Sequence, residues 1–159
     1  MMYEDCSFRL VVYDRISRRA CADREPPVGA VGITSEFKYN GKVYHVLFFD
    51  VDGKLAHLAN VLQYVRKLKC SYVVVRTKKG YHVVCFGYFK WKEVQHHWRA
   101  LKRTIDSKWI NLQSKRKYAI LRIAGKYSER DIKVVGVNVV EKNDPCLNKL
   151  MLEYLMMVR

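Results

Sequence analysis

The chain has 159 residues, half of them apolar, so it is long enough for one domain with a hydrophobic core of its own. Thirty Lys and Arg residues face fifteen Asp and Glu residues, and the net charge of +15 favours nucleic acid as a partner, because binding releases condensed counterions. The longest apolar runs are far too short to cross a bilayer and no basic amphipathic helix stands out, so we expect no association with a membrane.

The N-terminal part of the chain predicts strands. Residues 7–13 are rich in β-forming side chains. Asn40-Gly41 is typical of a two-residue hairpin turn. Residues 43–51 are apolar on both faces at their centre, so we expect a central strand there.

The middle of the chain alternates between helix and strand. Residues 54–69 repeat apolar side chains at helical spacing, and Asp52 stands where the N-cap of that helix belongs. Residues 71–77 and 81–89 predict two strands joined by a tight turn. Residues 91–104 predict a second helix, with its apolar side chains along one stripe.

The C-terminal part predicts two more strands and a closing helix. We expect residues 117–123 and 132–140 to pair as a hairpin around residues 125–130. Residues 143–158 have the apolar spacing of a helix.

The order strand, helix, strand, strand, helix, strand is that of RNA-recognition-like folds. We therefore predict an α+β fold in a single domain over residues 1–159, with an RNA-recognition-like split βαβ core (βαββαβ). Residues 1–42 would form a short N-terminal β extension that adds a strand and a hairpin, and a C-terminal helix would close the domain.

The five cysteines indicate neither a zinc knuckle nor a disulfide framework, because their number is odd and no two of them stand at the spacing of a metal knuckle. Cys70 and Cys85 lie in apolar segments and predict small buried side chains. The N-terminal residues contain no apolar signal region, so we expect the protein to be cytoplasmic.

Two aspartates, Asp50 and Asp52, end the central strand. Residues two apart on a strand point to the same face. Neighbouring carboxylates repel unless a cation lies between them, so the pair suits Mg²⁺ or Mn²⁺. A structural role explains the pair equally well: Asp50 would end the strand, and Asp52 would cap the helix or form a turn with Gly53.

The turn between the two middle strands is a second candidate. It brings Thr77, Lys79, Gly80 and His82 close together. A glycine-bearing turn exposes backbone N–H groups, which together with basic side chains would complement a triphosphate. For this segment alone a structural explanation is favoured, in which the basic hairpin is solvated and His82 packs in the sheet.

A third candidate pairs an acid with a base later in the chain. Asp106 follows the second helix, and Arg122 lies in an apolar strand segment. An arginine is costly to bury without an anionic partner. The alternative is an edge strand from which Arg122 faces water.

In their order and context these three places resemble the motifs of archaeo-eukaryotic primases and primase-polymerases, over a compact catalytic core at residues 43–125. Residues 48–52 are similar to the first motif of these enzymes, a hydrophobic strand that ends Asp-x-Asp or Asp-x-Glu. Thr77, Gly80 and His82 resemble the second motif, with Thr in place of the usual Ser.

The third motif of these enzymes is a hydrophobic-Asp pair, which residues 105–106 resemble, and residues 121–123 look like their arginine-bearing strand. The resemblance implies that Asp50, Asp52 and Asp106 hold two divalent ions, Mg²⁺ or Mn²⁺. No zinc motif accompanies the set.

The resemblance also implies a nucleotide-binding role for the basic turn. His82, Thr77 and Lys79 would contact the incoming triphosphate at the turn formed by Gly80, and Arg122 would add positive charge near the phosphates. The implied activity is template-dependent nucleotidyl transfer in DNA replication, with nucleoside triphosphates and a single-stranded DNA or RNA template as partners. Since the chain has no P-loop, any replicative helicase would be a separate protein.

Two other functions compete with this one. Residues 48–53 also resemble the first motif of haloacid-dehalogenase-type phosphatases, with Asp50 as nucleophile and Asp52 as acid or base. That fold needs a parallel sheet, whereas the turn at residues 78–80 is too short for a crossover. A nonenzymatic or degenerate nucleic-acid-binding module is the other alternative, in which surface aromatic residues would stack bases: Tyr72, Tyr81, Phe86 and Tyr88.

Overall fold

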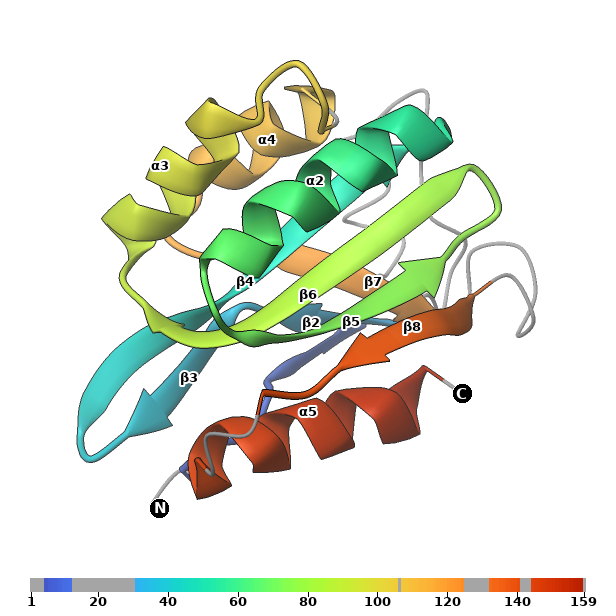
Figure 1. Ribbon diagram of the computed structural model, residues 1–159. Helices are drawn as coiled ribbons and strands as arrows, with labels where there is room; N and C mark the ends of the chain where they lie inside the picture. Colours follow the sequence, from blue (N-terminus) through green and yellow to red (C-terminus); the bar gives the residue numbers. More distant parts are fainter. Residues whose placement is uncertain (1–4, 13–30, 106, 125–131, 141–143, 159) are drawn as a thin grey trace.

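A computed structural model describes residues 5–12, 31–105, 107–124, 132–140 and 144–158 (Figure 1). This part of the chain is a mixed α+β fold with eight strands in two antiparallel sheets and four helices. The strands are β1 (Leu10–Val12), β2 (Val31–Thr34), β3 (Glu36–Tyr39), β4 (Lys42–Asp52), β5 (Ser71–Arg76), β6 (Gly80–Phe89), β7 (Ile120–Ala124) and β8 (Lys133–Asn138). The helices are α2 (Leu55–Lys67), α3 (Trp91–Ala100), α4 (Ser107–Ser114) and α5 (Pro145–Met157).

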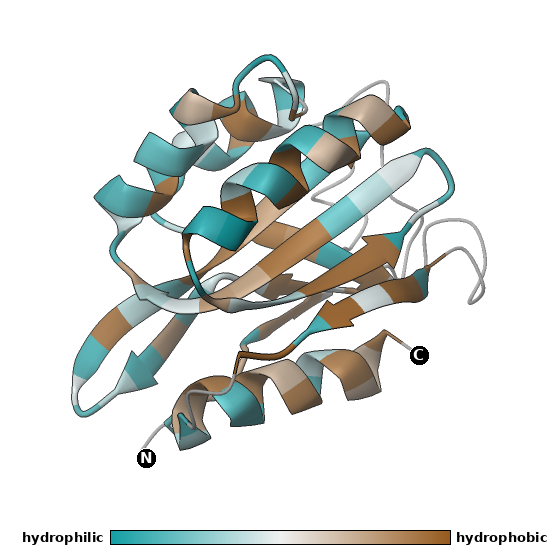
Figure 2. Ribbon diagram, viewed as in Figure 1, coloured by the Kyte–Doolittle hydropathy of each residue, from teal (hydrophilic) through white to brown (hydrophobic). Residues whose placement is uncertain are grey.

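The larger sheet has the strand order β3-β4-β6-β5-β8, and the smaller sheet has the order β1-β2-β7. Helices α2, α3 and α4 lie on one side of the larger sheet, and α5 lies on the other (Figure 1). The three inner strands carry hydrophobic residues along their middle parts (Figure 2), as expected where a strand is covered on both faces.

Local sequence signals correctly predict most of the larger sheet. Asn40 and Gly41 both have positive φ, 51° and 76°, as a two-residue turn of the mirror-image type requires, and they join β3 to β4. The central strand, the two middle strands and the first helix also form where the apolar patterns predict them. Trp98 of α3 is fully buried, and its indole N–H donates to the main-chain oxygen of Phe48 at 2.8 Å. This bond fixes α3 against β4.

Ser35 joins the two sheets, because the chain passes from β2 in one sheet to β3 in the other at this residue. Its hydroxyl oxygen accepts the N–H of Ala119 at 2.9 Å and lies 2.8 Å from Nδ1 of His45. Its main-chain oxygen accepts the N–H of Val46 at 2.8 Å. One buried serine therefore links β4 to the segment that leads into β7.

The expected cap of α2 is wrong. The helix begins at Leu55 with Lys54 as its N-cap, and β4 extends through Asp52. The N–H of Lys54 donates to the main-chain oxygen of Asp52 at 2.7 Å, which forms a turn between strand and helix. This turn moves the cap position two residues beyond Asp52.

The expected C-terminal hairpin is also wrong, and so is the strand predicted to complete the larger sheet after α3. Strand β7 pairs with β2 in the smaller sheet, whereas β8 pairs with β5 at the edge of the larger one. Strand β3 occupies the place beside β4. The apolar patterns predict these strands but carry no information about which open edge each strand meets.

Two further features differ from the sequence analysis around the second helix. Helix α3 ends at Ala100, earlier than predicted, and a separate helix, α4, follows it. Helix α4 was not predicted because its burial is weak: Gln113 is its one buried residue. Between the two helices, Ile105 forms a single antiparallel bridge to Val51 of β4.

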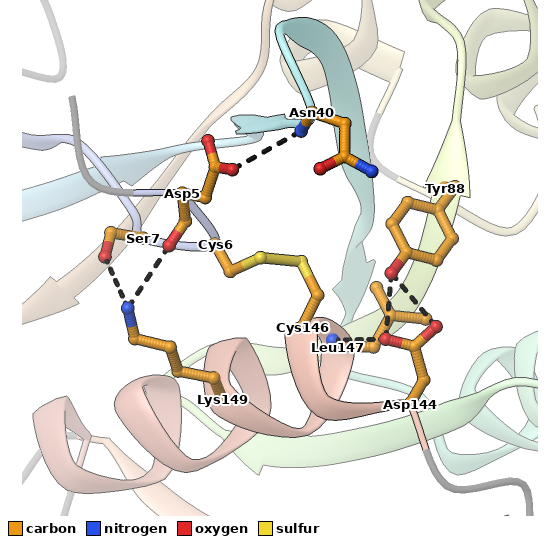
Figure 3. The surroundings of a disulfide bond; sticks show 9 residues. All are labelled: Asp5, Cys6, Ser7, Asn40, Tyr88, Asp144, Cys146, Leu147 and Lys149. Atoms are coloured by element: carbon orange, nitrogen blue, oxygen red, sulfur yellow. Dashed lines mark hydrogen bonds between the residues drawn. A yellow bond between two sulfur atoms is a disulfide. The ribbon is translucent and has the colours of Figure 1, made fainter. Parts of the chain in front are cut away.

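A disulfide joins Cys6 to Cys146 and ties the N-terminal segment to the first turn of α5 (Figure 3). Close by, Asp144 caps α5 and also accepts the hydroxyl of Tyr88 at 2.8 Å, while Lys149 Nζ donates to the main-chain oxygen of Asp5. The prediction that the cysteines form no disulfide framework is therefore wrong for this pair. Two cysteines 140 residues apart have no spacing that indicates pairing.

Candidate functional site

The two candidate metal ligands lie at the end of β4, beside the start of β6. Antiparallel pairing places Asp50 directly opposite His82, and Asp52 opposite Gly80. The carboxylate oxygen Oδ1 of Asp50 lies 3.8 Å from Nε2 of His82. The structure therefore brings together members of two motifs that are about thirty residues apart in the chain.

These acids lie on the face of the sheet away from α2 and α3. Phe86 of β6 packs against Tyr154 of α5, with ring centroids 6.3 Å apart, so its side chain lies on the α5 side. His82 lies four residues before Phe86 on the same strand, and side chains alternate along a strand, so both point to that side. Asp50 is the cross-strand partner of His82 and shares its face.

The site lies at the border between the core and solvent. His82 is buried, whereas the side chain of Asp50 is 30% exposed and Asp52 is exposed. The Cα atoms of the two aspartates are about 7 Å apart, from the rise of a strand. Two carboxylates on one face at this spacing can reach a common cation.

The turn after β5 packs directly on the main chain of the acidic strand. A methyl group on Gly80 would overlap the main-chain oxygen of Val51. On the facing turn, a methyl group on Gly53 would lie 2.7 Å from the main-chain oxygen of Lys79. Gly53 was not among the predicted site residues, although its place directly after Asp52 was a usable signal.

Thr77 shapes this turn. Its hydroxyl oxygen accepts the N–H of Gly80 at 3.1 Å, and its own N–H donates to the main-chain oxygen of Gly80 at 2.8 Å. Lys79 is exposed at the tip of the turn. The predicted nucleotide-binding residues Thr77, Lys79, Gly80 and His82 thus form one hairpin end, and Thr77 already has a structural bond there.

The other two predicted residues come from different parts of the fold. Asp106 lies outside the described residues, but its neighbour Ile105 bridges to Val51, the residue between the two aspartates. Arg122 is half-buried in β7, opposite Gly32, and therefore belongs to the smaller sheet. The chain next to Asp106 is thus beside the acids, whereas Arg122 lies on a strand that does not pair with β4.

A divalent cation is compatible with what the described residues offer. Among them, no group of three His, Cys, Asp or Glu side chains is arranged to hold a metal. Mg²⁺ keeps several waters and is commonly bound by one or two carboxylates together with substrate phosphates. Asp50 and Asp52 fit that role, and a full protein-only cage is not needed.

Two of the four aromatic residues proposed as a base-stacking surface are not available for it. Tyr72 and Phe86 are buried, because β5 and β6 are inner strands of the larger sheet. The Tyr88 ring packs against Phe37 and Tyr44, and its hydroxyl donates to Asp144. This prediction is therefore wrong for the members that lie in the core.

Comparisons with protein families, with curated proteins and with solved structures found no match to this chain. Within the described ranges, no helix has both the length and the apolar character needed to cross a bilayer.

Proposed function

We propose that the chain is a metal-dependent nucleotidyltransferase of the primase or primase-polymerase type, acting on a nucleic-acid template. The observation that carries the proposal is the register of β4 and β6, which sets Asp50 against His82 and Asp52 against the turn at Gly80. We further propose that β4, α2, β5, β6 and α3 form an RNA-recognition-like core, in which the segment at Ile105 takes part of the edge place beside β4.

In this proposal Asp50, Asp52 and Asp106 hold Mg²⁺ or Mn²⁺, which would neutralise charge on the phosphates and stabilise the leaving pyrophosphate. The protein contributes mainly positioning and fixed charge. His82 is buried on an inner strand of the sheet, so it has little room to move before any nucleotide arrives.

The basic end of the hairpin would receive the triphosphate. Lys79 is exposed at the tip of the turn, and the Thr77 hydroxyl oxygen holds the Gly80 N–H in place. Arg122 would add charge from the smaller sheet. The net charge of +15 suits a single-stranded DNA or RNA template, and a replicative helicase would be a separate partner.

The antiparallel sheets weigh against the phosphatase alternative. Each pairing between the described strands is antiparallel, including those of β4 with its neighbours. The haloacid-dehalogenase-type site needs a parallel sheet, whose strands are joined by crossovers. The Asp50-His82 pair also has no role in that chemistry.

Primer extension with Mn²⁺ and a labelled nucleotide tests the proposal. We expect template-dependent products from the wild-type chain, and a loss of at least about 100-fold in Asp50→Asn and in Asp52→Asn, because each removes charge from the metal site. The control is Asp5→Asn, which removes an exposed carboxylate near the opposite end of β4 and should retain activity.

Two results would contradict the proposal. One is release of phosphate from an aryl phosphate that Asp50→Asn abolishes, with no primer extension by the wild type. The other is tight binding of single strands, insensitive to chelator and to Asp50→Ala, again with no extension. The first result would support a phosphatase and the second a passive binding module.

A further inference from the structure

A hollow of about 430 Å³ lies between α3 and α4. On the α3 side it is lined by Trp98, Arg99, Lys102 and Arg103. Trp98 is fully buried and forms the floor, whereas the three cationic residues are exposed. Arg99, Lys102 and Arg103 stand at positions i, i+3 and i+4, so their side chains share one face of the helix and of the turn that follows it.

The α4 side of the hollow adds neutral groups. Ser107, Ile110 and Asn111 line it, again at positions i, i+3 and i+4, so α4 presents one face to it. Ser107 and Asn111 are exposed and can donate hydrogen bonds, and Ile110 is half-buried. Three cations, a hydroxyl and an amide around a partly apolar floor would suit a phosphodiester with its attached sugar.

Charge is concentrated in this region of the chain. Residues 90–117 contain nine Lys and Arg residues and two acids, so they supply a net charge of +7 out of the total of +15. Among the described residues, no carboxylate forms an ion pair with the three cations of the hollow. Within the described part of the chain, these cations therefore remain available to an anionic partner.

The hollow is also close to the proposed catalytic strand. Its floor, Trp98, donates to the main-chain oxygen of Phe48, two residues before Asp50. Ser107 lies two residues after Ile105, which bridges to Val51. From ordinary Cα spacings, the Cα atom of Ser107 lies within about 13 Å of that of Val51. The hollow lies on the side of the larger sheet that α3 and α4 cover, whereas Asp50 and Asp52 lie on the other face, so a strand held in the hollow would pass round the edge of β4 to reach them.

We infer that this hollow binds the phosphate backbone of a single-stranded nucleic acid and guides it past the edge of β4. The choice of ligand rests on the proposed function, which needs a template beside Asp50 and Asp52. A membrane surface is disfavoured, because Leu112 is the one large apolar side chain of α4 with substantial exposure.

Binding of a fluorescein-labelled 20-nucleotide thymidine strand, followed by anisotropy, tests the inference. The measurement is made in EDTA without nucleoside triphosphates at several salt concentrations, so no turnover is needed. The site variant is Lys102→Ala with Arg103→Ala. The control variant is Lys42→Ala with Lys133→Ala, which removes the same charge from exposed positions on β4 and β8.

We expect the site variant to bind at least about tenfold more weakly and to lower the salt-dependence slope by about 1.4, as for two lost phosphate contacts on a single strand. The control should lose much less affinity. Equal losses in the two double variants would overturn the inference, as would a site variant that binds like the wild type. Circular dichroism melting of both variants checks that they are folded.

The outcomes separate this inference from the proposed function. If the wild type fails to extend primers while the site variant still loses affinity, the proposed function falls and the hollow stands. Sedimentation with phosphatidylserine vesicles tests whether the hollow binds a membrane surface instead. If the site variant loses more vesicle binding than oligonucleotide binding, the inference is overturned.

Discussion

His45 lies in the junction between the two sheets and makes the stability of the fold depend on pH. Burial lowers the pKa of this imidazole to about 4, and Nδ1 lies 2.8 Å from the hydroxyl oxygen of Ser35. That oxygen already accepts the N–H of Ala119, so its own hydrogen is free to donate to a neutral ring.

The unfolded chain takes up a proton on His45 near pH 6.5, whereas the folded chain resists it down to about pH 4. The contribution of neutral His45 to the free energy of unfolding is therefore complete above about pH 6.5, and it declines as the pH falls below that value. We expect a loss of about 2 kcal/mol between pH 7 and pH 5 in urea unfolding, on top of smaller effects from other groups such as His97. His45→Gln should flatten this dependence, and an unchanged slope in that variant would contradict the role given to His45.

The turn at Gly80 shows how one element sets the geometry of another. Position 80 requires a glycine, because the main-chain oxygen of Val51 fills the space that a methyl group would need. We expect Gly80→Ala to cost about 2–3 kcal/mol of unfolding free energy, since either the turn or the end of β4 must shift. It should also lower primer extension more than its stability loss explains, because the same shift moves Asp52 relative to His82.

Gly136→Ala in β8 is the matched control, because its added methyl group would make ordinary contact with Val74 at 3.6 Å. We expect it to change the unfolding free energy by less than about 1 kcal/mol. Urea unfolding and primer extension of the two variants, side by side, check both points. A Gly80→Ala protein as stable and active as the Gly136→Ala protein would show that the turn is not tightly packed on β4.

At the level of elements, the sequence predicts what is locally determined. Asn40-Gly41 specifies a hairpin through its own backbone preferences, and the apolar runs of β4, β5 and β6 specify buried strands. The partners of β7 and β8 depend on which sheet edges other segments leave open, so the hairpin expected for them does not form. The pairing of Asp50 with His82 has the same origin: each motif was visible, but the register that joins them was not.

The whole molecule gathers several distant segments around the larger sheet. The disulfide fixes α5 to the N-terminal segment, and Ser35 links the two sheets. In a compartment that keeps thiols reduced, Cys6 and Cys146 would be free thiols, and α5 would be held by its cap and its packing. The proposed site at β4 and β6 does not depend on that bond.

The proposed function requires three carboxylates from two segments to hold two divalent ions in one shared site. Titration of Mn²⁺, followed by the loss of the free-ion signal in electron paramagnetic resonance, measures this directly. We expect the wild type to bind Mn²⁺, and Asp50→Asn, Asp52→Asn and Asp106→Asn each to bind at least about tenfold more weakly, while Asp5→Asn binds normally. Wild-type affinity in Asp106→Asn, or a wild-type protein that binds no better than Asp50→Asn, would contradict a shared metal site.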